Sequence, residues 1–235
     1  VDCDWSSDVC SSDLDDQPRV AYYDVTSHRL RLARFDGAQW TIETVDEASD
    51  VGRFASLALD ATNNPSIAYY DADGQRLKLA VKNGSSWDIS VVDSSANVGQ
   101  HASLALKSNG SPMIAYYDAT ASGVKFAEWT GLSWSASTLV SASLGSADSG
   151  RNLSLARDSQ DRPHIVFYDA TAKDLRYGNR DVNWAFRTID GDDSATQDRG
   201  RNPSLRINPV NGAPSASYFD AVDGGVHFVE GMVLY

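Results

Sequence analysis

The chain has 235 residues, of which 42% are hydrophobic and 22% are charged, so it is long enough and apolar enough to bury a sizeable core. Its 32 acidic side chains outnumber the 20 basic ones, and the formal net charge of −12 argues against nucleic acid as a partner. No apolar run approaches the ~18 residues of a membrane-spanning helix, so we expect no membrane insertion.

The first fourteen residues differ from the rest of the chain. Residues 3–14 read CDWSSDVCSSDL, include both cysteines (Cys3 and Cys10) and repeat nowhere else. They resemble a translated sequencing adapter, and we expect residues 1–14 to be a non-native segment without regular strands. The remaining residues contain no cysteine, so we expect neither a disulfide framework nor a zinc site.

Residues 15–235 contain a repeat that decides the predicted fold. A pair of aromatic residues followed by aspartate recurs at intervals of 47, 47, 51 and 51 residues, and a proline stands six residues before each aspartate. A tryptophan follows the first three aspartates by sixteen residues and the fourth by fifteen. The repeated aspartates are Asp24, Asp71, Asp118, Asp169 and Asp220.

The second copy of the repeat predicts four short strands. Its segments are rich in β-branched and aromatic residues, and Asp-Gly and Asn-Gly pairs between them favour tight hairpin turns. Apolar residues lie on both faces of the second segment, so the sheet needs neighbours on both sides. The predicted strands are residues 55–60, 66–71, 76–81 and 87–93.

Repeated four-stranded antiparallel sheets of this length are typical of a β-propeller, which is all-β. We expect a single propeller domain over residues 15–235, with five blades. The first blade is expected to lack its first strand and the last to end near its third, so the ring is expected to be truncated. The predicted blade repeats are about 15–46, 47–93, 94–140, 141–190 and 191–235.

The repeated pattern S-L-A-L-D, P-x-I-A-Y-Y-D, L-K-x-A and G-x-x-W resembles bacterial secreted propeller repeat proteins near the sialidase-like and fucose-lectin-like superfamilies. The resemblance implies a secreted or cell-surface protein. The sialidase Asp-box, S-x-D-x-G-x-x-W, keeps only its second half here, and Phe35, Lys82 and Trp129 stand at its aspartate position. The resemblance therefore implies a fold more than an activity.

Residues that recur in every blade are expected to serve packing, because a catalytic site occurs once around a propeller axis. A base follows each repeated aspartate by seven residues, which places the two as diagonal neighbours across a hairpin. We interpret them as structural ion pairs or turn caps, the alternative being a repeated ligand pocket. The pairs are Asp24 and Arg31, Asp71 and Lys78, Asp118 and Lys125, Asp169 and Arg176, and Asp220 and His227. The tryptophans and tyrosine pairs are expected in the core, the alternative being platforms for sugar rings.

Positions that vary between blades are better candidates for a ligand site. Arg53, Gln100, Arg151 and Arg201 each follow the glycine that precedes the first strand of a blade, which is the innermost strand of a propeller. We expect these side chains to ring the mouth of the central channel, where three guanidiniums would suit a carboxylate. The alternative is solvated arginines that bond loop carbonyls. His101 lies beside this ring and is a further candidate contact.

Metal sites are not expected. Asp190, Asp192, Ser194 and Asp198 match four positions of a calcium-binding loop, but the turn glycine and the bidentate glutamate of that loop are replaced. We interpret this segment as a solvated acidic loop. The histidines, which show no metal-ligand spacing, are His28, His101, His164 and His227.

We expect a non-catalytic, monomeric extracellular propeller that binds a glycan or protein ligand without a cofactor. The chain has only four glutamates and no single acid/base constellation, so we assign no catalytic residue. One alternative is a sialidase-like glycoside hydrolase whose arginines hold the carboxylate of an acidic sugar. The other alternative is a purely structural surface module.

Overall fold

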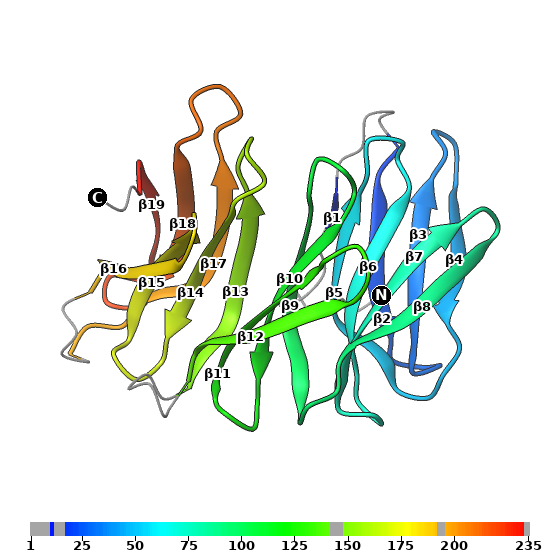
Figure 1. The fold of residues 1–235 in the computed structure, drawn as a ribbon, viewed down its shortest axis with the longest axis horizontal. Coiled ribbons are helices and arrows are strands. Elements are labelled where there is room, and N and C mark those ends of the chain that lie inside the picture. The colour runs from blue at the N-terminus through cyan, green and yellow to red at the C-terminus, as the bar shows by residue number, and fades with distance from the viewer. Residues whose placement is uncertain (1–9, 12–16, 142–147, 192–195, 233–235) are drawn as a thin grey trace.

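The computed structural model describes residues 10–11, 17–141, 148–191 and 196–232. In this part of the chain all regular structure is β-strand, arranged in five antiparallel sheets of three or four strands. Figure 1 shows the sheets following one another in chain order, from blue blade 1 to orange and red blade 5. The prediction of five antiparallel blades, the first and the last incomplete, is confirmed, because the first strand of blade 1 has only two residues and blade 5 has three strands.

Each blade is a meander in which consecutive strands are hydrogen-bonded neighbours. Blade 1 comprises β1 (Cys10–Ser11), β2 (Arg19–Asp24), β3 (Arg29–Phe35) and β4 (Trp40–Asp46). Blade 2 comprises β5 (Val51–Leu59), β6 (Pro65–Asp71), β7 (Arg76–Asn83) and β8 (Ser86–Asp93). Blade 3 comprises β9 (Val98–Leu106), β10 (Pro112–Asp118), β11 (Gly123–Trp129) and β12 (Trp134–Val140). Blade 4 comprises β13 (Ser149–Arg157), β14 (Pro163–Asp169), β15 (Asp174–Arg180) and β16 (Trp184–Asp190). Blade 5 comprises β17 (Arg199–Ile207), β18 (Pro214–Asp220) and β19 (Gly225–Glu230).

One expectation about blade 1 is wrong. Cys10 and Ser11 form the short strand β1, which pairs with Val20 and Arg19 of β2 and stands where the first strand was expected to be missing. The open edge of β2 has unpaired backbone groups, so an extended segment can pair there whatever its side chains. The non-native origin of residues 1–14 stays a prediction.

The apolar core lies between the blades. Four clusters of buried side chains occupy the four contacts between consecutive blades, which we call junctions 1–2, 2–3, 3–4 and 4–5. Tyr69 and Tyr116 are fully buried there, as predicted. Trp87 packs against the cluster of junction 1–2, but the equivalent Trp40 of blade 1 is 50% exposed, because no blade of the described chain covers it.

The first strands of blades 2 to 5 pack against one another in sequence order and so form the inner layer of the arc. They begin earlier than predicted, at Val51 in blade 2 rather than near residue 55, because a glycine with positive φ and a β-bulge extend them. At Gly99 (φ +107°) an added Cβ would lie 2.7 Å from the Cα of Leu77 in the preceding blade. The glycine thus permits the close approach of consecutive blades. No helix among the described residues is long and apolar enough to span a membrane.

Candidate functional site

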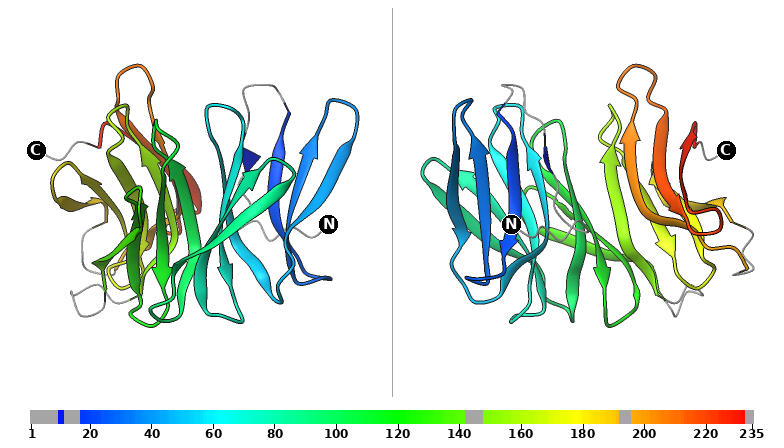
Figure 2. Two further views of the ribbon diagram at one scale, coloured as in Figure 1. Left: turned by 45° about the vertical axis from the view of Figure 1, so that its right-hand side comes forward. Right: turned by 180° about the vertical axis from the view of Figure 1, so that it is seen from behind.

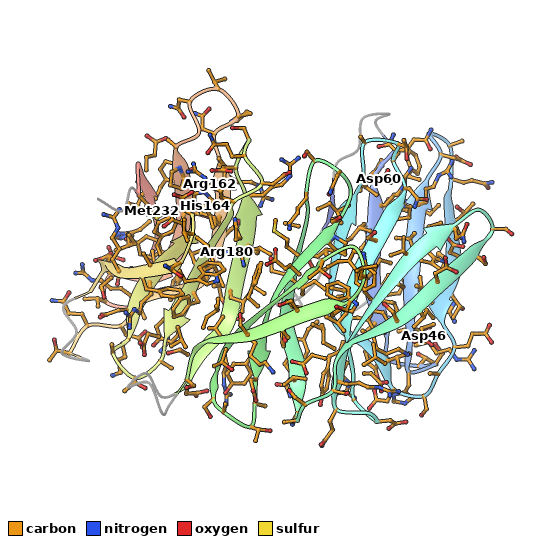
Figure 3. The ribbon with its side chains drawn as sticks, in the orientation of Figure 1. Asp46, Asp60, Arg162, His164, Arg180 and Met232 are labelled. Atoms are coloured by element: carbon orange, nitrogen blue, oxygen red, sulfur yellow. The ribbon has the colours of Figure 1, made fainter. Side chains whose placement is uncertain are left out.

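The two ends of the blades carry different loops. In a meander, the start of the first strand, the turn between the second and third strands, and the end of the fourth strand lie at one end. Asp46, at the end of β4, and Asp60, in the turn after β5, lie at opposite ends of the blades in Figure 3. The predicted ring residues belong to the end that carries Asp46, which we call the junction face.

At junction 1–2, Arg53 is part of a compact polar group. Its Nε and Nη2 donate to the two carboxylate oxygens of Asp50, each at 3.1 Å. The hydroxyl of Tyr23 donates to Asp50 Oδ1 at 2.6 Å, and Arg53 Cζ lies 5.0 Å from the centre of the Tyr23 ring. The Arg53 side chain is still 46% exposed, so this group, which we call a junction site, faces solvent.

Junction 3–4 repeats this arrangement. Arg151 Nε donates to Asp148 Oδ1 at 2.9 Å, and the Tyr117 hydroxyl donates to the same oxygen at 2.6 Å. Arg151 is 59% exposed and its Cζ lies 5.5 Å from the centre of the Tyr117 ring. The same arrangement of arginine, aspartate and tyrosine therefore occurs at two junctions.

Junction 4–5 has the same three residue types. Arg201 Nε and the Tyr168 hydroxyl donate to Asp198 Oδ1 at 2.9 and 2.8 Å. Arg201 Nη2 also bonds Asp198 Oδ2, which makes the pair bidentate. With its side chain 48% exposed, Arg201 also presents its guanidinium at the junction face.

Junction 2–3 is the neutral counterpart. The Tyr70 hydroxyl donates to Asn97 Oδ1 at 2.7 Å, and Gln100 Nε2 donates to the same oxygen at 3.4 Å. Both charged partners have been exchanged together, asparagine for aspartate and glutamine for arginine. The sequence signal that we missed is the spacing [DN]-x-G-[RQ], which recurs in blades 2 to 5.

The inner strands add two aromatic side chains beside the junction sites. Phe54 and His101, at equivalent positions of β5 and β9, have ring centres 4.4 Å apart. Both have positive φ, +54° and +51°, which is unusual for a bulky residue such as Phe54, whereas histidine and the asparagines Asn152 and Asn202 at the same position adopt it more readily. Residues held in such conformations often lie at functional sites. His101 was predicted as a contact, and Phe54 was missed.

Two of the junction aspartates, Asp50 and Asp198, are held ionised beside an arginine, so the two charges balance. The hydrogen bonds from Tyr23 and Arg53 hold the pKa of Asp50 below its ordinary value. Burial opposes ionisation of Asp198, yet the hydrogen bonds from Arg201 and Tyr168 lower its pKa overall. Each guanidinium has a carboxylate three residues before it, so these arginines do not present the uncompensated positive charge that the sequence suggested.

A second repeated group lies buried in the junctions and corrects a prediction. Lys125 Nζ lies 2.6 Å from Asp93 Oδ2, at the end of the preceding blade, and the Tyr116 hydroxyl donates to that oxygen at 2.6 Å. Lys78 likewise binds Asp46 at 2.5 Å. The predicted pairs of these lysines with the aspartate seven residues earlier are therefore wrong, because each lysine reaches across to the preceding blade.

The predicted pairing is confirmed in the other blades. The distances are 2.6 Å for Asp24 and Arg31, 3.4 Å for Asp169 and Arg176, and 3.9 Å for Asp220 and His227. The repeated aspartates also cap the following turn in every blade by accepting a backbone N–H, as Asp118 does from Thr120 at 2.9 Å. The repeated aspartates and these basic residues therefore stabilise the hairpins of the blades.

One group among the described residues has the composition of a metal site. Asp190, Asp220 and His227 can bring one ligand atom each within 4.8 Å of one another. Arg199 already lies between the carboxylates, with Nη1 2.8 Å from Asp190 and Nε 3.3 Å from Asp220. The positive charge that a metal would supply is therefore present in the protein. Of the calcium-loop residues, Asp192 and Ser194 lie outside the described residues.

Two further polar clusters lie elsewhere. Glu128 accepts two hydrogen bonds from Arg180, at 2.8 and 2.9 Å, and one from Lys107 at 2.9 Å. These bonds, from Arg180 first, hold the pKa of Glu128 low. His164, which Figure 3 places near Arg162 in blade 4, is 5% exposed and its burial lowers its pKa.

The sequence matches no protein-family model and no curated protein. Several solved structures share the fold. A triple arginine-to-alanine mutant of AofleA from Arthrobotrys oligospora has a TM-score of 0.64 at 9% identity, over 97% of this chain and 69% of that one. A fucose-specific lectin from Aleuria aurantia gives 0.56 at 18% identity, over 93% and 74%. A thermostable family-43 glycoside hydrolase gives 0.53 at 10% identity, over 96% and 88%. The likeness shows that this chain has a β-propeller fold.

Proposed function

We propose that this chain is a non-catalytic β-propeller that binds neutral saccharides at its junction sites, outside the cell. The observation that carries the proposal is the recurrence of one arrangement at three junctions. In each, a half-exposed arginine is fixed by an aspartate that also accepts a hydrogen bond from a tyrosine hydroxyl. A repeated set of weak sites gives avidity for a surface that displays many copies of one sugar.

The chemistry of a junction site suits hydroxyl groups. Carboxylate oxygens accept hydrogen bonds from sugar hydroxyls, and the exposed guanidinium N–H groups donate to them. Aromatic rings such as Phe54 offer a face to the apolar side of a sugar ring. Because each arginine is already balanced by an aspartate, the carboxylate of an acidic sugar would meet a like charge. We therefore expect neutral sugars to be preferred over acidic ones.

The carboxyl groups support binding rather than hydrolysis. A glycoside hydrolase needs a carboxylic acid whose pKa is raised, so that it can donate a proton near neutral pH. For twelve carboxyl groups of the described residues, Asp50, Asp93 and Glu128 among them, the pKa is displaced, and in all twelve it is displaced downward. The fucose-specific lectin among the structural neighbours provides a precedent for sugar binding on this fold, and its low identity leaves the sugar open.

The proposal is tested on an array of immobilised neutral and acidic glycans, scored for retained protein and for released sugar. We expect retention on neutral glycans without release. Arg151→Ala should weaken binding at its junction roughly 10- to 100-fold, because hydrogen bonds to charged groups contribute about 1.5–3 kcal/mol. Gln100→Ala, at the neutral junction, is the matched control and should change little. Release of sugar would make the chain an enzyme, and absence of any retention would favour a protein-binding or structural module.

A further inference from the structure

One position of each blade places a residue beside the following junction. It is the last residue of the turn between the second and third strands, four residues after the repeated aspartate. In both views of Figure 2 the blades follow one another side by side, so this turn lies next to the following blade. The carbonyl oxygen of the residue accepts a hydrogen bond from the N–H that begins the next blade, at 2.9 to 3.3 Å. At the four junctions these residues, which we call the turn residues, are His28, Gln75, Ser122 and Lys173.

The backbone at this position favours glycine. All four turn residues have positive φ, between +49° and +61°. Glycine adopts this conformation at no steric cost, and Gly224 stands at the equivalent position of blade 5, with φ +75°. Other residues are uncommon in it, and those that adopt it are concentrated at functional sites. Each junction therefore has a side chain at a position where the backbone conformation alone does not require one.

At junction 1–2 the turn residue is part of the junction site. The Tyr23 hydroxyl donates its only hydrogen to Asp50, so it accepts the hydrogen bond that joins it to His28 Nδ1 at 2.6 Å. The same nitrogen lies 4.0 Å from Asp50 Oδ1, and the imidazole is 60% exposed. The His28 ring therefore forms part of the surface that a ligand of Arg53 and Asp50 would contact.

At junction 3–4 the turn residue supplies a neutral hydroxyl. Burial, and then the hydrogen bond to Asp148, raise the pKa of Tyr117. Hydrogen bonds from Arg151 and Ser122 oppose this rise. Ser122 thus lies at the same tyrosine hydroxyl that His28 contacts in the first site. It adds no charge to the ion pair of Arg151 with Asp148.

At junction 4–5 the turn residue adds a positive charge. Burial opposes ionisation of Asp198, but the hydrogen bonds from Arg201 and Tyr168 outweigh it. The charge of Lys173, which is half-buried, adds to their effect and lowers the pKa of Asp198 further. Two basic side chains therefore face one carboxylate at this junction, whereas one of each is present at junction 3–4. The additional charge suits the carboxylate of an acidic saccharide.

We propose that the turn residue determines which saccharide each junction site prefers, and that Lys173 gives junction 4–5 a preference for acidic saccharides. This inference rests on the proposed function, because it requires saccharides to bind at the junctions. Junction 4–5 is then an exception to the preference for neutral sugars. At junction 3–4, where Ser122 stands in place of the lysine, the carboxylate of the same sugar meets a balanced ion pair.

Chains that keep one of the three arginines allow each junction to be titrated alone. Arg53→Ala with Arg151→Ala keeps junction 4–5, and Arg53→Ala with Arg201→Ala keeps junction 3–4. Each chain is titrated calorimetrically with the neutral monosaccharide best retained on the array and with the corresponding uronic acid, in which C6 is a carboxylate. At low ionic strength the junction 4–5 chain should bind the uronic acid about 3- to 5-fold more tightly, as expected of a partly exposed charge pair. Added salt should reduce this preference.

Exchange of the turn residues provides the decisive comparison. Lys173→Ser in the junction 4–5 chain should remove the preference, mainly by weakening binding of the uronic acid. Ser122→Lys in the junction 3–4 chain should create it. Both substitutions use a residue that this position already holds in another blade, so circular dichroism and the thermal midpoint should not change. Lys82→Ser is the control for net charge, because Lys82 lies near the turn after β7, at the end of blade 2 opposite the junction face, and should leave the preference unchanged.

The outcomes separate this inference from the proposed function. If the junction 4–5 chain binds the neutral sugar but shows no preference for the uronic acid, or if Lys173→Ser leaves that preference unchanged, the inference is overturned and the proposed function stands. If neither single-site chain binds the neutral sugar, the proposed function is refuted and the inference fails with it.

Discussion

The Lys125→Met substitution removes the ion-pair partner of Asp93, the buried carboxylate of junction 2–3. Burial by itself would raise the pKa of Asp93, but the hydrogen bonds from Lys125 and Tyr116 outweigh it and bring the pKa to about 2. Against the ordinary value of 3.8, that difference corresponds to roughly 2 kcal/mol of stability at neutral pH. Removing the lysine also leaves Asp93, which is 8% exposed, without its countercharge. We expect a loss of about 3–5 kcal/mol in the free energy of unfolding.

The loss should depend on pH with a definite sign. A carboxyl whose pKa is lowered in the folded state contributes stability above about pH 4, and that contribution disappears as the pH falls toward 2. The difference between the unmodified chain and Lys125→Met should therefore be largest near pH 7 and shrink below pH 4. Urea unfolding at several pH values measures it. Lys82→Met is the control, because its partner Glu43 is 43% exposed, and should cost less than about 1 kcal/mol. A loss for Lys125→Met that is below 1 kcal/mol, or equal at pH 3 and pH 7, would refute the reasoning.

Two further predictions compare equivalent positions by thermal or urea unfolding. Trp87→Ala should cost about 3 kcal/mol because Trp87 packs against the junction cluster, whereas Trp40→Ala should cost less than about 1 kcal/mol at its exposed position; equal losses would contradict the burial difference. Gly99→Ala should cost about 3 kcal/mol or more, since the new Cβ would lie 2.7 Å from Leu77 in addition to the positive φ. Gly131→Ala has a similar φ with nothing within 4 Å and should cost only about 1 kcal/mol, and a smaller loss for Gly99→Ala would show that the blades can separate there.

The blades could be predicted from the sequence because the residues that begin and end a strand lie close together in the chain. Turn residues and β-branched content fix where strands end, and the second strand observed at Pro65–Asp71 differs by one residue from the predicted 66–71. The partners of charged side chains could not be predicted in the same way. Lys78 and Asp46 are 32 residues apart and meet only when two blades pack, so spacing within one hairpin gave Lys78 the wrong partner.

Residues that face each other across a junction are exchanged together from one junction to the next. Junction 3–4 has Phe167 in place of the tyrosine and Ser141 in place of the aspartate of the buried group, so the hydroxyl and its acceptor are absent together. At junction 4–5, His227 stands where blades 2 and 3 have lysine, and Arg199, which stands where those two blades have valine, binds Asp190 instead. Such paired exchanges can be read in the sequence once the structure shows which positions face each other.

The candidate site was predicted in part. The positions of Arg53, Gln100, Arg151 and Arg201 at the start of the inner strands follow from the repeat. The hydrogen bonds of these side chains to the residues three positions earlier were not predicted. The arginines were expected to form a ring of positive charge without acidic partners. The positive φ of Phe54 was also beyond prediction, since the bulge that requires it depends on packing against the neighbouring blades.

The number of saccharide molecules bound per chain tests the central claim most directly. Calorimetric titration with the neutral sugar best retained on the array should give three similar sites, at the junctions of Arg53, Arg151 and Arg201. Each single arginine-to-alanine variant should remove one of them and leave the others unchanged. A single site per chain, or a number of sites that these variants do not alter, would contradict the assignment of binding to the junctions.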